Sequence, residues 1–135
     1  MTPPAAPRLD GLQILIVDDD DDSLDVLGEA FTFLGAAVEA MDNARDALAW
    51  LEHKQADVIV SDLSMPDMDG LQLMREVRTL PAEAIRPTPA IALTAFARDE
   101  DRQRALASGY QGFLAKPMDP FQVAEEILRL VTGRS

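Results

Sequence analysis

The stretch Leu12-Gln13-Ile14-Leu15-Ile16-Val17 is almost wholly aliphatic, and it runs directly into five consecutive aspartates at positions 18–22. A short continuous apolar run of this kind predicts a strand that is buried on both faces, as in a parallel sheet. The runs 57–61 and 89–94 have the same character, whereas the weaker runs 36–40 and 110–114 fit edge or near-edge strands.

Helix signals lie between these runs, at 23–34, 43–54, 71–80 and 98–107, and another follows Asp119. Gly35 ends the first, and Pro120 stands where proline is favoured, at the first position of a helix. Strands that alternate with helices predict an α/β fold of the type (βα)5, with a doubly wound parallel sheet of five strands. In the flavodoxin-like strand order 2-1-3-4-5, the first and third strands are central neighbours.

The length of 135 residues fits a single domain. We expect this domain over residues 11–131, between a flexible N-terminal tail at 1–10 and a short C-terminal tail at 132–135. Because few residues of the sequence follow the last predicted helix, we expect no output domain in this chain. The first residues lack the apolar core of a signal peptide, and no apolar run approaches the ~20 residues of a membrane span, so we expect a cytoplasmic protein.

The chain is strongly acidic, with 24 acidic and 12 basic side chains and a net charge of −12. Such a charge disfavours binding to nucleic acids and to anionic membranes. The absence of cysteine excludes disulfides, zinc–thiolate sites and cysteine nucleophiles. Residues 1–70 hold 16 acidic and three basic side chains, and this asymmetry suggests either a solvated face or a cation site.

Polar residues stand where four of the five predicted strands end. In open α/β sheets, ligands bind beyond the carboxyl ends of the strands, at the switch point of the strand order. Asp18 and Asp19 follow the first strand, Asp62 ends the third, Thr94 ends the fourth and Lys116 follows the fifth. We therefore expect these five side chains to converge on one crevice.

Three carboxylates in one crevice repel each other unless one is protonated or a cation binds among them. Their hard oxygen atoms suit Mg²⁺. One carboxylate could then act as a nucleophile toward phosphorus and form an aspartyl phosphate. Lys116 would supply a fixed positive charge and Thr94 a hydroxyl donor, in a reaction that depends mainly on positioning and on charge neutralisation.

Four motifs occur in order along the chain, and together they resemble the receiver domains of two-component response regulators over about residues 11–131. None of the motifs is specific alone, but their order and spacing are. The motifs are Ile14-Leu15-Ile16-Val17-Asp18-Asp19, then Val58-Ile59-Val60-Ser61-Asp62 with Met65-Pro66 and Met68-Asp69-Gly70, then Ala92-Leu93-Thr94-Ala95, and Phe113-Leu114-Ala115-Lys116-Pro117.

The resemblance implies that Asp62 is the phosphoacceptor and that Thr94 binds the phosphoryl oxygen and shifts on activation. It implies that Lys116 pairs with the phosphoryl group and that its bond to Pro117 is cis. Phe113 takes the place of the switch aromatic residue, without the hydroxyl of a tyrosine. The implied ligands of Mg²⁺ are Asp18, Asp19, Asp62 and the backbone carbonyl of Ser64.

The implied phosphodonor is a phosphohistidine on a sensor histidine kinase or on a histidine phosphotransfer protein. An unidentified downstream protein would bind through the fourth helix, fifth strand and fifth helix. No enzymatic activity is expected beyond phosphorylation and dephosphorylation of the chain itself. The remaining aspartates of the acidic run, at positions 20–22, are expected to be solvated or to cap the first helix.

Two alternatives stay open at this point. A phosphohydrolase similar to the haloacid dehalogenase class would use Asp18 as its nucleophile, although the later Asp-Asp pair of that class does not occur after Lys116. The sequence is also compatible with a receiver module excised from a hybrid kinase. The nucleophile distinguishes the first alternative, because a receiver uses Asp62.

Overall fold

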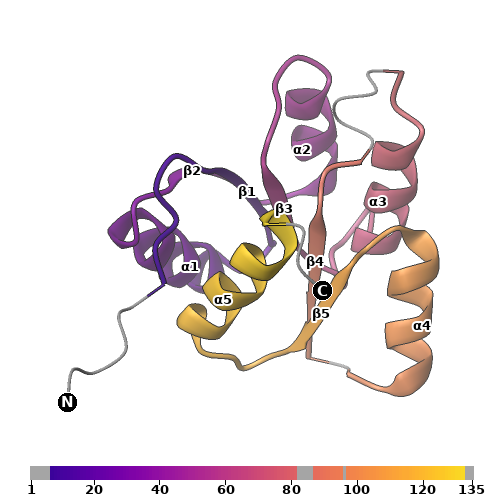
Figure 1. The fold of residues 1–135 in the computed structure, drawn as a ribbon. Helices are drawn as coiled ribbons and strands as arrows, with labels where there is room; N and C mark the ends of the chain where they lie inside the picture. Colours follow the sequence, from indigo (N-terminus) through magenta and orange to yellow (C-terminus); the bar gives the residue numbers. More distant parts are fainter. Residues whose placement is uncertain (1–6, 82–86, 96, 133–135) are drawn as a thin grey trace.

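The computed structural model describes residues 7–81, 87–95 and 97–132, and in these ranges five parallel strands alternate with five helices (Figure 1). The strand order is β2-β1-β3-β4-β5, so the predicted doubly wound (βα)5 fold is confirmed. The strands are β1 (Gln13–Val17), β2 (Ala37–Met41), β3 (Val58–Asp62), β4 (Ala90–Thr94) and β5 (Gly112–Ala115).

The centre of the sheet is formed by the most aliphatic runs of the sequence. All residues of β3 and β4 are buried, as are four of the five residues of β1. The weaker runs form β2 and β5, which lie at the two edges of the sheet, as predicted. The register aligns Val17 of β1 with Ser61 of β3, and Thr94 of β4 with Ala115 of β5. The carboxyl ends of these four strands therefore lie side by side and form what we call the carboxyl edge of the sheet.

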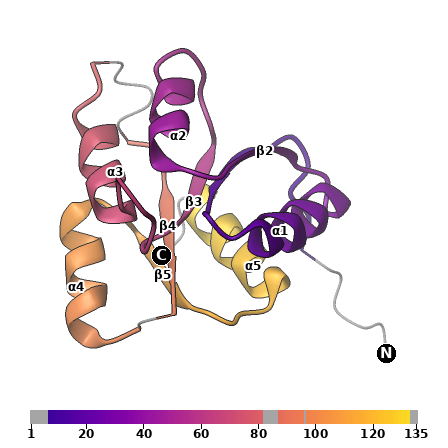
Figure 2. The same ribbon diagram turned by 180° about the vertical axis from the view of Figure 1, so that it is seen from behind.

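Helices cover both faces of the sheet, as the two opposite views show (Figure 2). Helices α1 and α5 contact each other on one face, and α3 contacts α2 and α4 on the other. Among the described residues, none of the helices combines the length and apolarity that a bilayer crossing requires. The helices are α1 (Asp21–Phe33), α2 (Ala44–Leu51), α3 (Gly70–Arg78), α4 (Asp99–Ser108) and α5 (Pro120–Val131).

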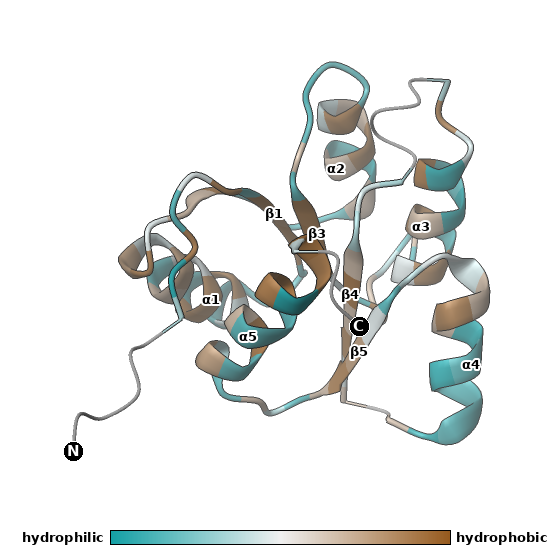
Figure 3. Ribbon diagram, in the orientation of Figure 1, coloured by the Kyte–Doolittle hydropathy of each residue, from teal (hydrophilic) through white to brown (hydrophobic). Residues whose placement is uncertain are grey.

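Apolar side chains fill two layers between the sheet and its helices, which is why the strands are the most hydrophobic part of the ribbon (Figure 3). Leu15 and Ile59 point to the layer under α2, α3 and α4. Ile14 and Val60, one position away on the same strands, point to the layer under α1 and α5. This alternation is the period of two that a strand imposes, and here both of its faces are apolar.

Polar caps fix several helix starts. Asp20 accepts a hydrogen bond from the amide of Asp22 and so caps α1, which confirms one of the roles predicted for the aspartate run. Asp69 caps α3 and Asp119 caps α5, where Pro120 occupies the first helical position. Because Asp20 is the cap, α1 starts two residues before the predicted position 23.

The ordered domain begins earlier than residue 11, which corrects part of the predicted tail. Leu9 is fully buried in the layer under α1 and α5, and its amide donates to the carbonyl of Leu34 at 2.8 Å. Burial of this leucine fixes residues that the sequence assigned to a flexible segment. At the other end Thr132 still bonds to the carbonyl of Leu128. The rest of the predicted tails, residues 1–6 and 133–135, lies outside the described residues.

Candidate functional site

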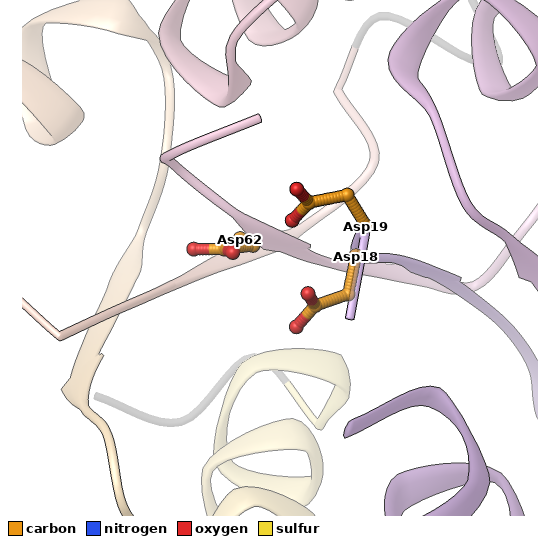
Figure 4. Close-up of side chains that lie close together, drawn as sticks. All are labelled: Asp18, Asp19 and Asp62. Atoms are coloured by element: carbon orange, nitrogen blue, oxygen red, sulfur yellow. The ribbon is translucent and has the colours of Figure 1, made fainter. Parts of the chain in front are cut away.

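Three carboxylates meet at the carboxyl ends of β1 and β3 (Figure 4). Asp62 is the last residue of β3, and Asp18 and Asp19 follow β1. Since Val17 and Ser61 are register partners, the next residues on the two strands also lie beside each other. One oxygen from each carboxylate lies within 4.8 Å of the others. The structure thus brings together the three acidic side chains that the sequence predicted to converge.

The three carboxylates differ in their surroundings. Asp18 and Asp62 are buried, with 1% and 7% of their surface exposed, whereas Asp19 is exposed. An oxygen of Asp18 accepts a hydrogen bond from the amide of Asp20 at 2.9 Å, and one of Asp62 accepts from the amide of Ser64 at 3.3 Å. These backbone bonds orient the two buried carboxylates, and Asp19 remains open to solvent.

Lys116 completes this group from the carboxyl end of the edge strand β5. Its Nζ lies 2.7 Å from Oδ2 of Asp18 and 3.4 Å from Oδ2 of Asp62. The residue directly follows β5, and its amide donates to the carbonyl of Thr94 at 2.8 Å. The Lys116–Pro117 bond is cis, as the family resemblance implied.

The two predicted switch residues lie on neighbouring strands. Thr94 is the last residue of β4 and is 2% exposed. It lines a cavity of about 210 Å³ together with Ser64 and Arg104, among other residues. Phe113 on β5 is half-buried and packs against the apolar layer under α2, α3 and α4. Thr94 therefore lies at the carboxyl ends of the strands, beside the carboxylates. Phe113 pairs with Ala92, two residues before Thr94, and so lies farther from the strand ends.

Burial and charge act in opposite directions on the central groups. Burial and the nearby charge of Asp18 raise the pKa of the Asp62 carboxyl, and these effects outweigh the opposing influence of Lys116 and the Ser64 amide. For Lys116, burial lowers the pKa, but the hydrogen bond to Asp18 and the charge of Asp62 outweigh it and raise the pKa overall. The site therefore holds an ionised lysine beside a carboxylate that is costly to ionise without a further cation.

The donor atoms of this site fit a hard divalent cation. Asp18, Asp19 and Asp62 offer only carboxylate oxygens, which are the ligands that Mg²⁺ prefers. The backbone of Ser64, which the resemblance implied as a further ligand, is adjacent to the site, because its amide already bonds to Asp62. A cation at this position would offset the burial and the nearby charge of Asp18 that raise the pKa of Asp62.

Sequence reasoning missed two residues that pack directly behind Asp62. Ser61 is fully buried, and its hydroxyl donates to the carbonyl of Asp62 at 2.9 Å. Tyr110 is also buried, and its hydroxyl donates to the carbonyl of Gly70 at 2.7 Å. The sequence places Tyr110 only in the weak apolar run 110–114. The one feature that could have drawn attention to it is that it is the only tyrosine of the chain.

Known proteins are similar to this chain in sequence. A 14.6 kDa uncharacterised protein of Leptolyngbya boryana is 48% identical over 120 residues, which cover 89% of this chain and 87% of that protein. Hybrid signal transduction histidine kinase D of Dictyostelium discoideum is 34% identical over 131 residues, which cover 91% of this chain but only 8% of the kinase.

A solved structure agrees with these relatives. The receiver domain of the sensor histidine kinase PA1611 of Pseudomonas aeruginosa superposes with a TM-score of 0.83 at 31% identity. The match covers 91% of this chain and 99% of that domain, whose active-site cleft coordinates a magnesium ion. The sequence profile of the response regulator receiver domain matches residues 14–128 of this chain. This match spans most of the sequence and includes every residue of the carboxylate–lysine site, so the chain belongs to the response regulator receiver domain family.

Proposed function

We propose that the chain is the phosphoacceptor of a two-component system or phosphorelay. Asp62 would receive a phosphoryl group from a phosphohistidine, and the phosphorylated chain would change its contacts with other proteins. The observation that carries this proposal is the group of three carboxylates beside one lysine at the carboxyl edge of the sheet. Phosphoryl transfer needs this combination of a nucleophile and neutralising charge.

In the proposed reaction, a carboxylate oxygen of Asp62 forms a bond to phosphorus while the phosphorus–nitrogen bond of phosphohistidine breaks. The imidazole leaves with the electron pair and takes a proton from solvent. Lys116 is placed to neutralise the phosphoryl oxygens, since it already lies 3.4 Å from Asp62. Thr94, at the end of the adjacent strand, would offer its hydroxyl to the same oxygens.

Asp18, Asp19, Asp62 and the backbone carbonyl of Ser64 would hold Mg²⁺, which when bound supplies positive charge to the reacting phosphoryl group. Water would later hydrolyse the aspartyl phosphate and release inorganic phosphate. In the proposed chemistry the chain modifies only its own Asp62, and no separate small-molecule substrate is turned over. Thr94 and Phe113 would transmit the added charge from the site to the surface.

The relatives suggest the partners. Because the similar proteins include a hybrid histidine kinase, we propose a sensor histidine kinase or a histidine phosphotransfer protein as the phosphodonor. For the downstream partner we propose the surface of α4, β5 and α5. Leu106 on α4 and Phe121 on α5 support this choice, because they are 48% and 40% exposed although they are large and apolar.

Intact mass spectrometry after incubation with Mg²⁺ and acetyl phosphate tests the proposal, with wild type, Asp62→Asn and Asp18→Asn run in parallel. We expect one phosphoryl group on the wild type, none on Asp62→Asn, and little on Asp18→Asn because a metal ligand is lost. A modification that persists in Asp62→Asn but disappears in Asp18→Asn would place the nucleophile after β1, as in a hydrolase. A wild type that neither binds Mg²⁺ nor takes a phosphoryl group would refute the proposal.

A further inference from the structure

Tyr110 connects the α4–β5 turn to the start of α3 through a single buried hydrogen bond. Its hydroxyl donates to the carbonyl of Gly70 at 2.7 Å, across 40 positions of sequence. The side chain is 2% exposed, so water does not compete for this bond. A tyrosine hydroxyl in such surroundings contributes only if it finds a partner, and Gly70 provides one.

Gly70 in turn touches the backbone of the phosphoacceptor. A β-carbon at Gly70 would lie 2.3 Å from the carbonyl oxygen of Asp62 and 2.8 Å from the α-carbon of Leu63, so no side chain fits there. The amide of Gly70 also donates to the carbonyl of Leu63 at 3.0 Å and closes the loop between β3 and α3. A displacement of Gly70 would therefore directly displace the backbone at the end of β3.

A second buried hydroxyl holds the same point. Ser61 donates to the carbonyl of Asp62 at 2.9 Å, which is the carbonyl that a side chain at Gly70 would strike. Burial raises the pKa of Tyr110 and outweighs the smaller opposing effect of the neighbouring Ser61 hydroxyl. Tyr110 thus remains a protonated donor near neutral pH. The hydroxyls of Tyr110 and Ser61 together hold the backbone next to Asp62, through the carbonyls of Gly70 and Asp62.

The other end of this connection is equally well fixed. The amide of Tyr110 donates to the carbonyl of Ala105 at the end of α4, at 3.1 Å. The amide of Gln111 donates to Ala90 at the start of β4, at 2.9 Å. Arg78, the last residue of α3, donates from its guanidinium to the carbonyl of Gly109 at 2.6 Å. The turn that carries Tyr110 is therefore tied to α3, α4 and β4.

We propose that Tyr110 is a positioning residue for phosphorylation: its hydroxyl, through the Gly70 carbonyl, holds the Asp62–Leu63 backbone in the geometry that binds the phosphoryl group. This inference rests on the proposed function and deepens it. By thermodynamic linkage, if the hydrogen bond favours the phosphoryl-bound state, then binding at Asp62 strengthens the hydrogen bond and stiffens the α4–β5 turn.

The test is Tyr110→Phe, which keeps the ring and removes only the hydroxyl. Thr88→Val is the matched control, because it removes another buried hydroxyl, just before β4. For each protein we would measure the dissociation constant of beryllofluoride, a phosphoryl analogue, in saturating Mg²⁺ by calorimetry, and the free energy of unfolding in urea. We expect Tyr110→Phe to weaken beryllofluoride binding by roughly threefold to tenfold, the value of one buried hydrogen bond.

A purely structural role would lower the free energy of unfolding in Tyr110→Phe as in Thr88→Val and leave both affinities equal to that of the wild type. That result would overturn the inference. A wild type that does not bind beryllofluoride would instead refute the proposed function, and this inference with it. If Tyr110→Phe does not fold, the wild type decides, because its only tyrosine gives one ring signal in tyrosine-labelled NMR spectra. A shift of that signal on beryllofluoride binding supports the inference, and an unchanged signal overturns it.

Discussion

The ammonium group of Lys116 lies closer to Asp18 than to Asp62, at 2.7 Å against 3.4 Å. The ammonium group therefore contacts Asp18, a proposed metal ligand, more closely than it contacts Asp62, the proposed nucleophile. Its side chain is 19% exposed and that of Asp18 is 1% exposed, so this ion pair is largely desolvated. An uncompensated charge at such a position is costly. The hydrogen bond to Asp18 opposes the effect of burial and helps to raise the pKa of Lys116. Lys116 and a metal ion would thus compete for the same carboxylate.

Replacement of Lys116 by methionine should separate the effect of the lysine on Mg²⁺ binding from its effect on phosphorylation. We expect Mg²⁺ to bind more tightly, by roughly threefold to tenfold, because a competing positive charge next to Asp18 and Asp62 is removed. Phosphorylation by acetyl phosphate should slow by about 100-fold, since the charge that stabilises the phosphoryl group is lost. Lys54→Met is the control, because it removes the only other lysine, which is exposed. Weaker Mg²⁺ binding in Lys116→Met would contradict the competition.

Replacement of Asp62 by asparagine should stabilise the fold in the absence of metal. Burial and the charge of Asp18 raise the pKa of Asp62 in the folded state, so the fold disfavours its ionised form. The wild type therefore bears this cost at any pH above the folded pKa, and it loses the cost as the pH falls through that value. In EDTA at pH 7.5 we expect Asp62→Asn to raise the melting temperature by roughly 2–5 °C.

The pH dependence provides the check. Near pH 4 the wild-type carboxyl is increasingly protonated, so the advantage of Asp62→Asn should shrink. Asp25→Asn, which changes an exposed aspartate on α1, controls for the general effect of a removed charge in an acidic protein. An advantage that is equal at both pH values, or that Asp25→Asn reproduces, would show that burial of Asp62 is not its cause.

Binding of Mg²⁺ should itself stabilise the protein. A ligand that binds only the folded state adds about 2.7 kcal/mol at a concentration 100 times its dissociation constant. The melting temperature should therefore rise on titration with MgCl₂ and return on addition of EDTA. Asp19→Asn should reduce this rise, because the exposed third carboxylate of the cluster is lost. An unchanged rise in that variant would remove Asp19 from the metal site.

The architecture was predictable because its signals are local. The continuous aliphatic runs around Ile14 and Val60 specify buried parallel strands, and the carboxyl ends of those strands must meet at one edge. This is why Asp18 and Asp62, which are 44 positions apart, could be paired in advance. The family resemblance added the cis bond at Lys116–Pro117, which no local pattern contains.

Contacts that depend on side-chain reach were not predictable in the same way. The burial of Leu9 against α1 depends on how the chain folds back, and a proline-rich start before it favoured a tail. The bond from Tyr110 to Gly70 joins a turn to a helix start, and neither position carries a signal of the other. The preference of Lys116 for Asp18 over Asp62 is a difference of tenths of an ångström, which no sequence pattern specifies.

Gly70 and Gly28 provide a matched pair of substitutions that tests the packing behind the site. An alanine at Gly70 would place its β-carbon 2.3 Å from the Asp62 carbonyl, against backbone that cannot give way cheaply. We expect Gly70→Ala to cost about 3 kcal/mol of stability and to slow phosphorylation. At Gly28, inside α1, the β-carbon would meet only a methyl group of Val38, at 4.0 Å.

Gly28→Ala should therefore stabilise the protein by about 0.5–1 kcal/mol, because glycine inside a helix loses more conformational entropy on folding than alanine does. Urea unfolding of both variants measures the two effects, and the acetyl phosphate reaction shows whether only Gly70→Ala affects the site. Equal stability changes in the two variants would mean that the loop after β3 moves aside freely. The backbone of Asp62 would then not be held by Gly70, and the connection to Tyr110 would lose its first link.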